Sequence, residues 1–289
     1  MDSQELFKRV RRIEIKTKAL TQNVFAGEYH SAFKGHGMSF AEVREYIAGD
    51  DVRDIDWNVT ARTGRAHVKL YEEERELTVM LLIDVSGSQQ FGTRRQTQQD
   101  TAIEAAATLA FSALQNNDKI GAIYFSDRVE KFIPPQKGRK HVLYILREML
   151  DIEPKGTHTD LNVGLEYFLR TTKRRSIAFL FSDFLDNHDY SKNLRIAARK
   201  HDFVAIHLSD PFTRQLPDVG LVKFQDAESG YTRIVDTSSS KVQMQHARWW
   251  AQELSRIDLL LQKCGIDHTL LYSDDDTTQA LLRLFQHRT

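Results

Sequence analysis

The residues best suited to chemistry are a carboxylate and two hydroxyls spaced two residues apart: Asp84, Ser86 and Ser88. They follow residues 77–83, an apolar run that predicts a buried strand. The three side chains therefore lie in a loop at the carboxyl end of a strand, where open α/β sheets bind ligands. Hard oxygen donors suit Mg²⁺ better than Zn²⁺, so the loop indicates a cation site.

Two later segments supply further oxygen donors. Thr157 and Thr159 lie in a glycine-containing loop before a helical stretch, and Asp183 follows residues 177–181, a second apolar strand. A Ser-Gly-Ser sequence alone is often an ordinary turn. The prediction of a cation site therefore depends on whether these two segments lie next to the loop that contains Asp84, Ser86 and Ser88. Either threonine could contribute a ligand, and Thr157 is also placed to cap the helix.

The order Asp-x-Ser-x-Ser, then a threonine, then an aspartate after a later strand resembles the metal-ion-dependent adhesion site of von Willebrand factor A domains. In that family the hydroxyls bind the cation directly or nearly so, and the aspartates act largely through waters. The family spacing fits Thr159 better than Thr157. The resemblance implies an Mg²⁺ site, with Mn²⁺ as the alternative cation, formed by Asp84, Ser86, Ser88, Thr159 and Asp183.

The region before this site carries a longer and more specific pattern. Residues 40–57 contain Phe-Ala-Glu-Val-Arg-Glu-Tyr and then Gly-Asp-Asp-Val-Arg-Asp-Ile-Asp-Trp, and residues 61–74 contain Ala-Arg-Thr-Gly and Tyr-Glu-Glu-Glu. Over roughly residues 25–210 the chain resembles the bacterial domain-of-unknown-function-58 family, whose members place this tract before a von Willebrand A-like domain. Members are often found alongside MoxR-type AAA+ ATPases. The resemblance implies a non-enzymatic, metal-dependent protein-binding module that works with such an ATPase, or its client, in chaperone-like assembly or maturation of protein complexes.

From residue 77 onward, apolar strands alternate with helical stretches, which is typical of a mostly parallel sheet. We predict a von Willebrand A-like (Rossmann-type) α/β domain over residues 77–289, with helices flanking the sheet and a hairpin insertion near 218–236. Residues 1–76 are predicted to form a family-specific, β-containing N-terminal region.

Within the N-terminal region, the residue pattern predicts a short helix over 39–47, ended by Gly49. Alternating polar and apolar residues predict a strand over 54–60. We expect Trp57 to pack in a core and Arg53 to be held by a nearby carboxylate.

Composition narrows the classes of partner. The 40 basic and 40 acidic residues cancel, so nothing favours overall attraction to nucleic acid or to a membrane surface. One cysteine, Cys264, excludes an internal disulfide and suits a reducing compartment. The chain shows no signal-peptide pattern and no apolar run near the roughly 20 residues that a spanning helix needs. We therefore expect a cytoplasmic protein without direct membrane insertion.

The alternative function is an Mg²⁺-dependent phosphatase of the haloacid-dehalogenase-like type. That family also has an aspartate after its first strand and another after a later strand, as Asp84 and Asp183 are here. Its chemistry needs a second aspartate two residues after the first as general acid, and Ser86 occupies that position. A serine hydrolase is disfavoured because no glycine stands two residues before Ser86, and no Walker A sequence for ATP hydrolysis is present.

Overall fold

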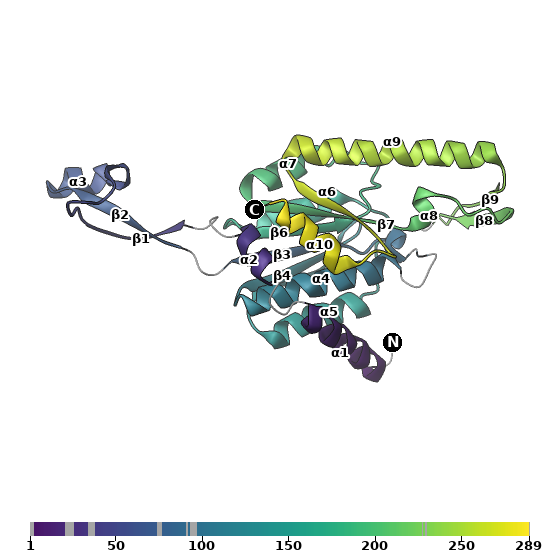
Figure 1. Ribbon diagram of the computed structural model, residues 1–289, viewed down its shortest axis with the longest axis horizontal. Coiled ribbons are helices and arrows are strands. Elements are labelled where there is room, and N and C mark those ends of the chain that lie inside the picture. Colours follow the sequence, from purple (N-terminus) through teal and green to yellow (C-terminus); the bar gives the residue numbers. More distant parts are fainter. Residues whose placement is uncertain are drawn as a thin grey trace. The chain divides into compact units, whose positions relative to one another are not determined.

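The computed structural model describes residues 3–20, 26–33, 38–73, 77–90, 92, 97–226, 228 and 230–288. The chain divides into two compact units. The smaller unit is Phe33–Leu77, and the larger comprises Met1–Ala32 and Thr78–Thr289. The larger unit is an α/β domain, and the smaller is a two-stranded ribbon that carries a short helix (Figure 1).

Six described strands of the larger unit form one sheet in the order β10-β7-β6-β3-β4-β5. Neighbouring strands are parallel except β5, which pairs antiparallel with β4 at one edge. This arrangement confirms the predicted α/β fold class with a mostly parallel sheet flanked by helices. The strands are β3 (Thr78–Asp84), β4 (Lys119–Phe125), β5 (Val129–Gln136), β6 (Ile177–Ser182), β7 (Asp202–Ser209) and β10 (Asp267–Tyr272).

Helices cover both faces of the sheet (Figure 1). On one face α4 contacts α1, α5 and α10, and on the other α7 contacts both α6 and α9. The helices of this unit are α1 (Ser3–Leu20), α2 (Ala26–Phe33), α4 (Gln98–Gln115), α5 (Arg139–Asp151), α6 (Leu161–Thr171), α7 (Ser191–Lys200), α8 (Pro211–Arg214), α9 (Ser240–Cys264) and α10 (Thr277–Gln286). None of the described helices is both long and apolar enough to cross a membrane.

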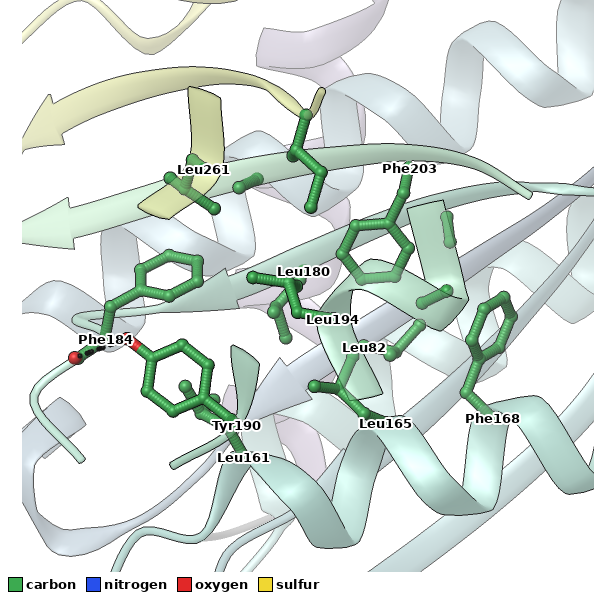
Figure 2. Packing of buried hydrophobic residues seen from close by; sticks show 14 of the residues in the cluster. Leu82, Leu161, Leu165, Phe168, Leu180, Phe184, Tyr190, Leu194, Phe203 and Leu261 are labelled. Atoms are coloured by element: carbon green, nitrogen blue, oxygen red, sulfur yellow. Dashed lines mark hydrogen bonds between the residues drawn. The ribbon is translucent and has the colours of Figure 1, made fainter. Parts of the chain in front are cut away.

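The core beneath α6, α7 and α9 is built from alternate residues of the central strands. Met80 and Leu82 of β3 and Leu180 of β6 are fully buried there with Leu165 and Leu194 of the covering helices. Figure 2 shows Leu82, Leu180, Leu165 and Leu194 packed together. Because both faces of these strands are covered, their sequences are continuous apolar runs, which is why the strands could be predicted.

Residues 1–32 belong to the α/β unit. This assignment differs from the predicted one, which placed the whole of residues 1–76 in a separate N-terminal region. The helix α1 packs against α4 and α5. Arg9 pairs with Asp100 of α4 at 2.8 Å, and Arg139 of α5 pairs with Glu14 at 2.6 Å. An amphipathic helix buries its apolar stripe on whatever helix layer is open to it, regardless of distance along the chain.

The smaller unit contradicts two predictions. Residues predicted as a helix over 39–47 belong mainly to a strand, β1 (Met38–Glu45), which pairs antiparallel with β2 (His67–Glu73). The residues predicted as a strand over 54–60 form part of the 3₁₀ turn η2 (Val52–Asp54) and of α3 (Trp57–Thr63). Asp56 caps α3 by accepting hydrogen bonds from the Asn58 and Val59 N–H groups, and Gly64 ends it at φ 71. Local capping outweighed the alternating pattern.

The expected burial of Trp57 is also wrong, because the side chain is 69% exposed. Gly49 lies in a turn after β1, at φ 116, and does not end a helix. The expected partner of Arg53 is present: its guanidinium pairs with Asp51 at 2.7 Å.

The predicted hairpin insertion of the larger unit is present. Strands β8 (Leu221–Gln225) and β9 (Thr232–Asp236) pair antiparallel in a sheet of their own.

Candidate metal centre

The predicted site residues meet at the carboxyl ends of β3 and β6, which are neighbouring parallel strands. Strand β3 ends at Asp84 and leads into the 3₁₀ turn η3 (Gly87–Gln90), which contains Ser88. Strand β6 ends at Ser182, directly before Asp183. Thr159 comes from the loop between α5 and α6. Carboxyl ends of parallel strands lie at one edge of a sheet, so two distant segments reach the same place.

Three hydroxyl oxygens lie close together at this edge. Ser86 Oγ is 3.1 Å from Ser88 Oγ and 2.8 Å from Thr159 Oγ1. Ser86 and Thr159 are buried, and Ser88 is half-buried. Thr157 is exposed, and its hydroxyl lies 2.8 Å from His158 Nδ1. Of the two candidate threonines, the structure therefore places Thr159 beside the serines.

The carboxylate of Asp84 is buried and held in place through both oxygens. Its Oδ1 accepts a hydrogen bond from the Ser86 N–H at 3.0 Å, and its Oδ2 accepts one from the Ser182 hydroxyl at 2.8 Å. Burial, and then the negative charge of Asp183, raise the pKa of Asp84 to about 7. These hydrogen bonds aim the carboxylate, but they do not neutralise its charge.

Asp183 is the second buried carboxylate of the site. Burial raises its pKa, and the negative charge of Glu228 acts in the same direction. Among the described residues, no lysine, arginine or histidine forms an ion pair with Asp84 or Asp183. Two adjacent buried carboxylates without a basic partner are costly, so a cation at this position would stabilise them.

The donor set provides the test of whether these residues fit a cation. Ser88 Oγ and Thr159 Oγ1 both lie within hydrogen-bond distance of Ser86 Oγ, and Thr159 Oγ1 also contacts Glu228 Oε1 at 2.7 Å. The buried carboxylates of Asp84 and Asp183 belong to the same site. Hard oxygen donors are the ligands that Mg²⁺ and Mn²⁺ prefer, so the donor set fits either cation.

Tertiary contacts hold the loop that carries Asp183. Phe184 has φ 57, in the left-handed region that a bulky residue rarely adopts. Its ring is buried, and its carbonyl accepts hydrogen bonds from the Tyr190 hydroxyl at 3.2 Å and from Arg256 of α9 at 3.3 Å. Figure 2 shows the bond from Tyr190. Strained backbone of this kind is maintained only where surrounding contacts hold it, and it is concentrated at functional sites.

The loop before Thr159 is held by a partly buried hydrogen-bond network. Glu130 Oε1 accepts hydrogen bonds from the Ser126 hydroxyl and the Gly156 N–H, both at 2.7 Å. Burial acts to raise the pKa of Glu130, but these hydrogen bonds outweigh it and lower the pKa. A Cβ at Gly156 would collide with Ser126 Oγ. Gly156 therefore allows the loop to pass close enough to bring Thr159 to the site.

Two residues at the site were missed by reasoning from the sequence. Ser182 orients Asp84, and its position as the last residue of a strand, beside Asp183, was a usable signal. Glu228 places its Oε1 2.7 Å from Thr159 Oγ1, although the two residues are 69 positions apart. No local pattern marks Glu228, because its position depends on how the hairpin docks.

A second group of possible ligands, Asp160, Asp186 and His188, lies nearby, with atoms within 4.8 Å of one another. Asp186 accepts a hydrogen bond from the Leu161 N–H at 2.8 Å and contacts His188 Nδ1 at 2.8 Å. Asp160 caps α6 by accepting from the Asn162 N–H at 2.9 Å. These contacts fix the start of α6, so the group has a structural explanation without a metal.

Comparison with solved structures returns matches of low sequence identity. BatB from Bacteroides thetaiotaomicron matches with a TM-score of 0.48 and 12% identity, covering 73% of this chain and 98% of that protein chain. The VWA domain of SpRpn10 matches with a TM-score of 0.38 and 14% identity, over 73% of this chain and 95% of that one. Proximal thread matrix protein 1 from the mussel byssus, described with a zinc-occupied MIDAS motif, matches with a TM-score of 0.39 and 18% identity. The match covers 47% of this chain and 38% of that protein chain.

Comparison with known protein sequences finds relatives of higher sequence identity than the solved structures. The Uncharacterized protein Rv1480 of Mycobacterium tuberculosis (strain ATCC 25618 / H37Rv) is 32% identical over 290 residues, covering all of this chain and 91% of the relative. The Uncharacterized protein YeaD of Bacillus subtilis (strain 168) is 26% identical over 114 residues, 39% of this chain and 26% of the relative. The model of the family described as "Protein of unknown function DUF58" matches residues 42–255. Since that match extends over more than half of its length, the chain belongs to the DUF58 family.

Proposed function

We propose that this chain is a non-enzymatic, metal-dependent protein-binding module. In this proposal Ser86, Ser88 and Thr159 supply neutral oxygen ligands to Mg²⁺ or Mn²⁺, and Asp84 and Asp183 complete the site largely through water. The bound cation supplies an electrophilic position for an acidic side chain of a partner. The observation that carries the proposal is the convergence of three hydroxyl oxygens beside two buried carboxylates without a basic partner among the described residues.

The charge of the ligands supports binding to an acidic group. Hydroxyl oxygens are neutral, so they leave most of the charge of a divalent cation uncompensated. A bound cation is then the largest local charge at the site. A carboxylate from a partner gains most of its binding free energy from that charge, and chelation of the metal would abolish the interaction.

The β8–β9 hairpin supports a macromolecular partner. Leu221 and Ile234 are exposed large apolar side chains on this hairpin. The register pairs Leu221 with Asp236 and Lys223 with Ile234, so the two apolar residues are diagonal neighbours on one face. Exposed apolar side chains grouped on one face favour contact with another protein.

The partner in this proposal is a MoxR-type AAA+ ATPase, or its client, in chaperone-like assembly or maturation of protein complexes. The support is membership of the DUF58 family, whose model matches residues 42–255, since the family resemblance implies such an ATPase as the partner. The chain itself lacks a Walker A sequence, so the ATPase would supply the energy of nucleotide hydrolysis.

Capture of partners from a lysate of the native cell tests the proposal. The immobilised chain should retain the ATPase or its client in Mg²⁺ and lose it in EDTA. Thr159→Ala should lose the partner, whereas Thr157→Ala, two residues away and exposed, should retain it. Binding that survives both EDTA and Thr159→Ala would contradict a metal-dependent interface. Efficient hydrolysis of p-nitrophenyl phosphate by the purified chain would contradict the non-enzymatic assignment.

A further inference from the structure

The loop of the β8–β9 hairpin brings an acidic side chain of this chain to the candidate metal centre. Glu228 lies between the two strands and is half-buried, with its Oε1 2.7 Å from Thr159 Oγ1. A carboxylate oxygen can only accept this hydrogen bond, so the Thr159 hydroxyl donates it. The contact joins the hairpin to the loop before α6.

The described residues on either side of Glu228 are joined by backbone hydrogen bonds. The Asp226 N–H donates to the Tyr231 carbonyl at 2.8 Å, and the Gly230 N–H donates to the Asp226 carbonyl at 2.9 Å. The Glu228 N–H donates to Asp226 Oδ1 at 3.2 Å. These bonds tie Glu228, Gly230 and Tyr231 to Asp226, next to the end of β8, so the hairpin holds the backbone of Glu228.

The other acidic side chains at the site disfavour a negative charge on Glu228. Asp84 and Asp183 are buried at the same site and carry the same charge when ionised, and no basic side chain of the described residues pairs with either. Three carboxylates around three hydroxyl oxygens repel one another unless a cation lies among them. Glu228 therefore places a carboxylate of this chain beside Thr159, one of the ligands of the proposed function.

We propose that Glu228 is a cation ligand supplied by the chain itself, and that the β8–β9 hairpin thereby occupies the position that an acidic residue of a partner must take. This inference rests on the proposed function. The partner binds by displacing Glu228, and the hairpin moves away from Thr159 when it does. In the absence of a partner, the bound cation holds the hairpin against the sheet edge.

Mn²⁺ as a probe tests this inference, because bound Mn²⁺ speeds the relaxation of water protons in proportion to its directly bound, exchanging waters. Removing a protein ligand opens a position to water. With six positions around the cation, Glu228→Ala should raise the relaxivity of bound Mn²⁺ about 1.5-fold, from two waters to three. Asp236→Asn is the matched control, since it removes one negative charge from the same hairpin but its side chain contacts the Ser238 N–H. The relaxivity of Mn²⁺ bound to Asp236→Asn should equal that of Mn²⁺ bound to the wild type.

Hydrogen exchange supplies a readout on the hairpin itself. Mn²⁺ should slow exchange of the amides in residues 221–225 and 232–236 in the wild type and in Asp236→Asn, but not in Glu228→Ala. N-acetylglutamate, a mimic of an acidic side chain, should lower the relaxivity of the Glu228→Ala complex at concentrations that leave the wild type unchanged. Equal melting temperatures in EDTA will show that the variants fold.

The outcomes separate this inference from the proposed function. If the wild type and Glu228→Ala bind Mn²⁺ with equal relaxivity and equal hairpin exchange, Glu228 is not a ligand and only this inference is overturned. If the wild type binds no Mn²⁺, the proposed function is overturned and this inference with it.

Discussion

Ser182 Oγ donates a hydrogen bond of 2.8 Å to Asp84 Oδ2, linking the ends of the neighbouring strands β6 and β3. Both residues are buried, and Ser182 Oγ also accepts a hydrogen bond from the Phe184 N–H at 3.1 Å. The direction of one candidate metal-site carboxylate therefore depends on a hydroxyl from the adjacent strand.

Ser182→Ala is expected to weaken Mn²⁺ binding roughly 10- to 100-fold, the usual effect of removing a group that orients a metal ligand. Calorimetric titration measures the change. Ser176→Ala is the matched control, because it removes a buried hydroxyl that lies 3.0 Å from His201 Nδ1 at the other end of β6. It should lose stability but keep Mn²⁺ affinity. Equal loss of affinity in both variants would show that Ser182 acts only through stability.

Ser86→Ala/Ser88→Ala is expected to abolish stabilisation by Mg²⁺. For the wild type at a Mg²⁺ concentration 100 times Kd, binding should add about 2.7 kcal/mol to the free energy of unfolding. Thermal unfolding with and without Mg²⁺ checks this. Ser240→Ala/Ser255→Ala removes two exposed hydroxyls of α9 and should retain the full shift. A Mg²⁺ shift that persists in Ser86→Ala/Ser88→Ala would place the cation elsewhere.

Gly156→Ala is expected to weaken metal binding without changing any ligand. The new Cβ would collide with Ser126 Oγ, so the loop that carries Thr159 must move. Overpacking of this kind typically costs about 1–3 kcal/mol. Gly27→Ala in α2 is the control, because a Cβ there meets open space. Calorimetry should show weaker metal binding and urea unfolding a lower free energy of unfolding in Gly156→Ala. Gly27→Ala should show neither change.

The buried His201 should make the protein less stable in mild acid. Burial, and then the positive charges of Lys200 and Arg175, lower the pKa of His201 to about 4. The unfolded chain has a histidine pKa of about 6.5, so between these pH values the unfolded state binds one more proton. The stabilisation is complete above pH 6.5 and is lost as pH falls toward 4, by up to about 1.4 kcal/mol per pH unit. Urea unfolding from pH 7.5 to 5 should give a shallower pH dependence for His201→Gln, and identical slopes would refute this.

Trp57→Ala should change the free energy of unfolding by less than about 0.5 kcal/mol, because most of the side chain is exposed. Trp250→Ala is the contrasting substitution, since Trp250 of α9 is 4% exposed and its loss should cost about 3–5 kcal/mol. Chemical unfolding followed by circular dichroism compares the two. A large loss in Trp57→Ala would mean that the exposed ring makes contacts that the described residues do not include.

The central sheet could be predicted from the sequence because strands buried on both faces are unbroken apolar runs. The residues Asp84, Ser86, Ser88 and Asp183 follow two such runs, and the carboxyl ends of parallel strands share one edge. That reasoning placed four of the predicted ligands together. Family spacing favoured Thr159, but its close approach to Ser86 required the loop geometry that Gly156 allows.

The N-terminal tract was predicted less well because short segments have ambiguous periodicity. Residues 54–60 alternate like a strand, but the Asp56 side chain can bond to backbone N–H groups two and three residues later, and this begins a helix. Residues 38–45 became a strand because β2 was available to pair with them. Pairing between strands is a tertiary event, and the local pattern did not contain it.

The sequence by itself determined the buried strands, the polar residues at their ends and the family of the chain. Only the tertiary structure brought Ser182 to Asp84 and Glu228 to Thr159. These pairs are 98 and 69 residues apart, so each contact depends on how strands order in the sheet or how a hairpin docks. Local residue spacing carries no information about such contacts, because the intervening chain can follow many paths before packing selects one.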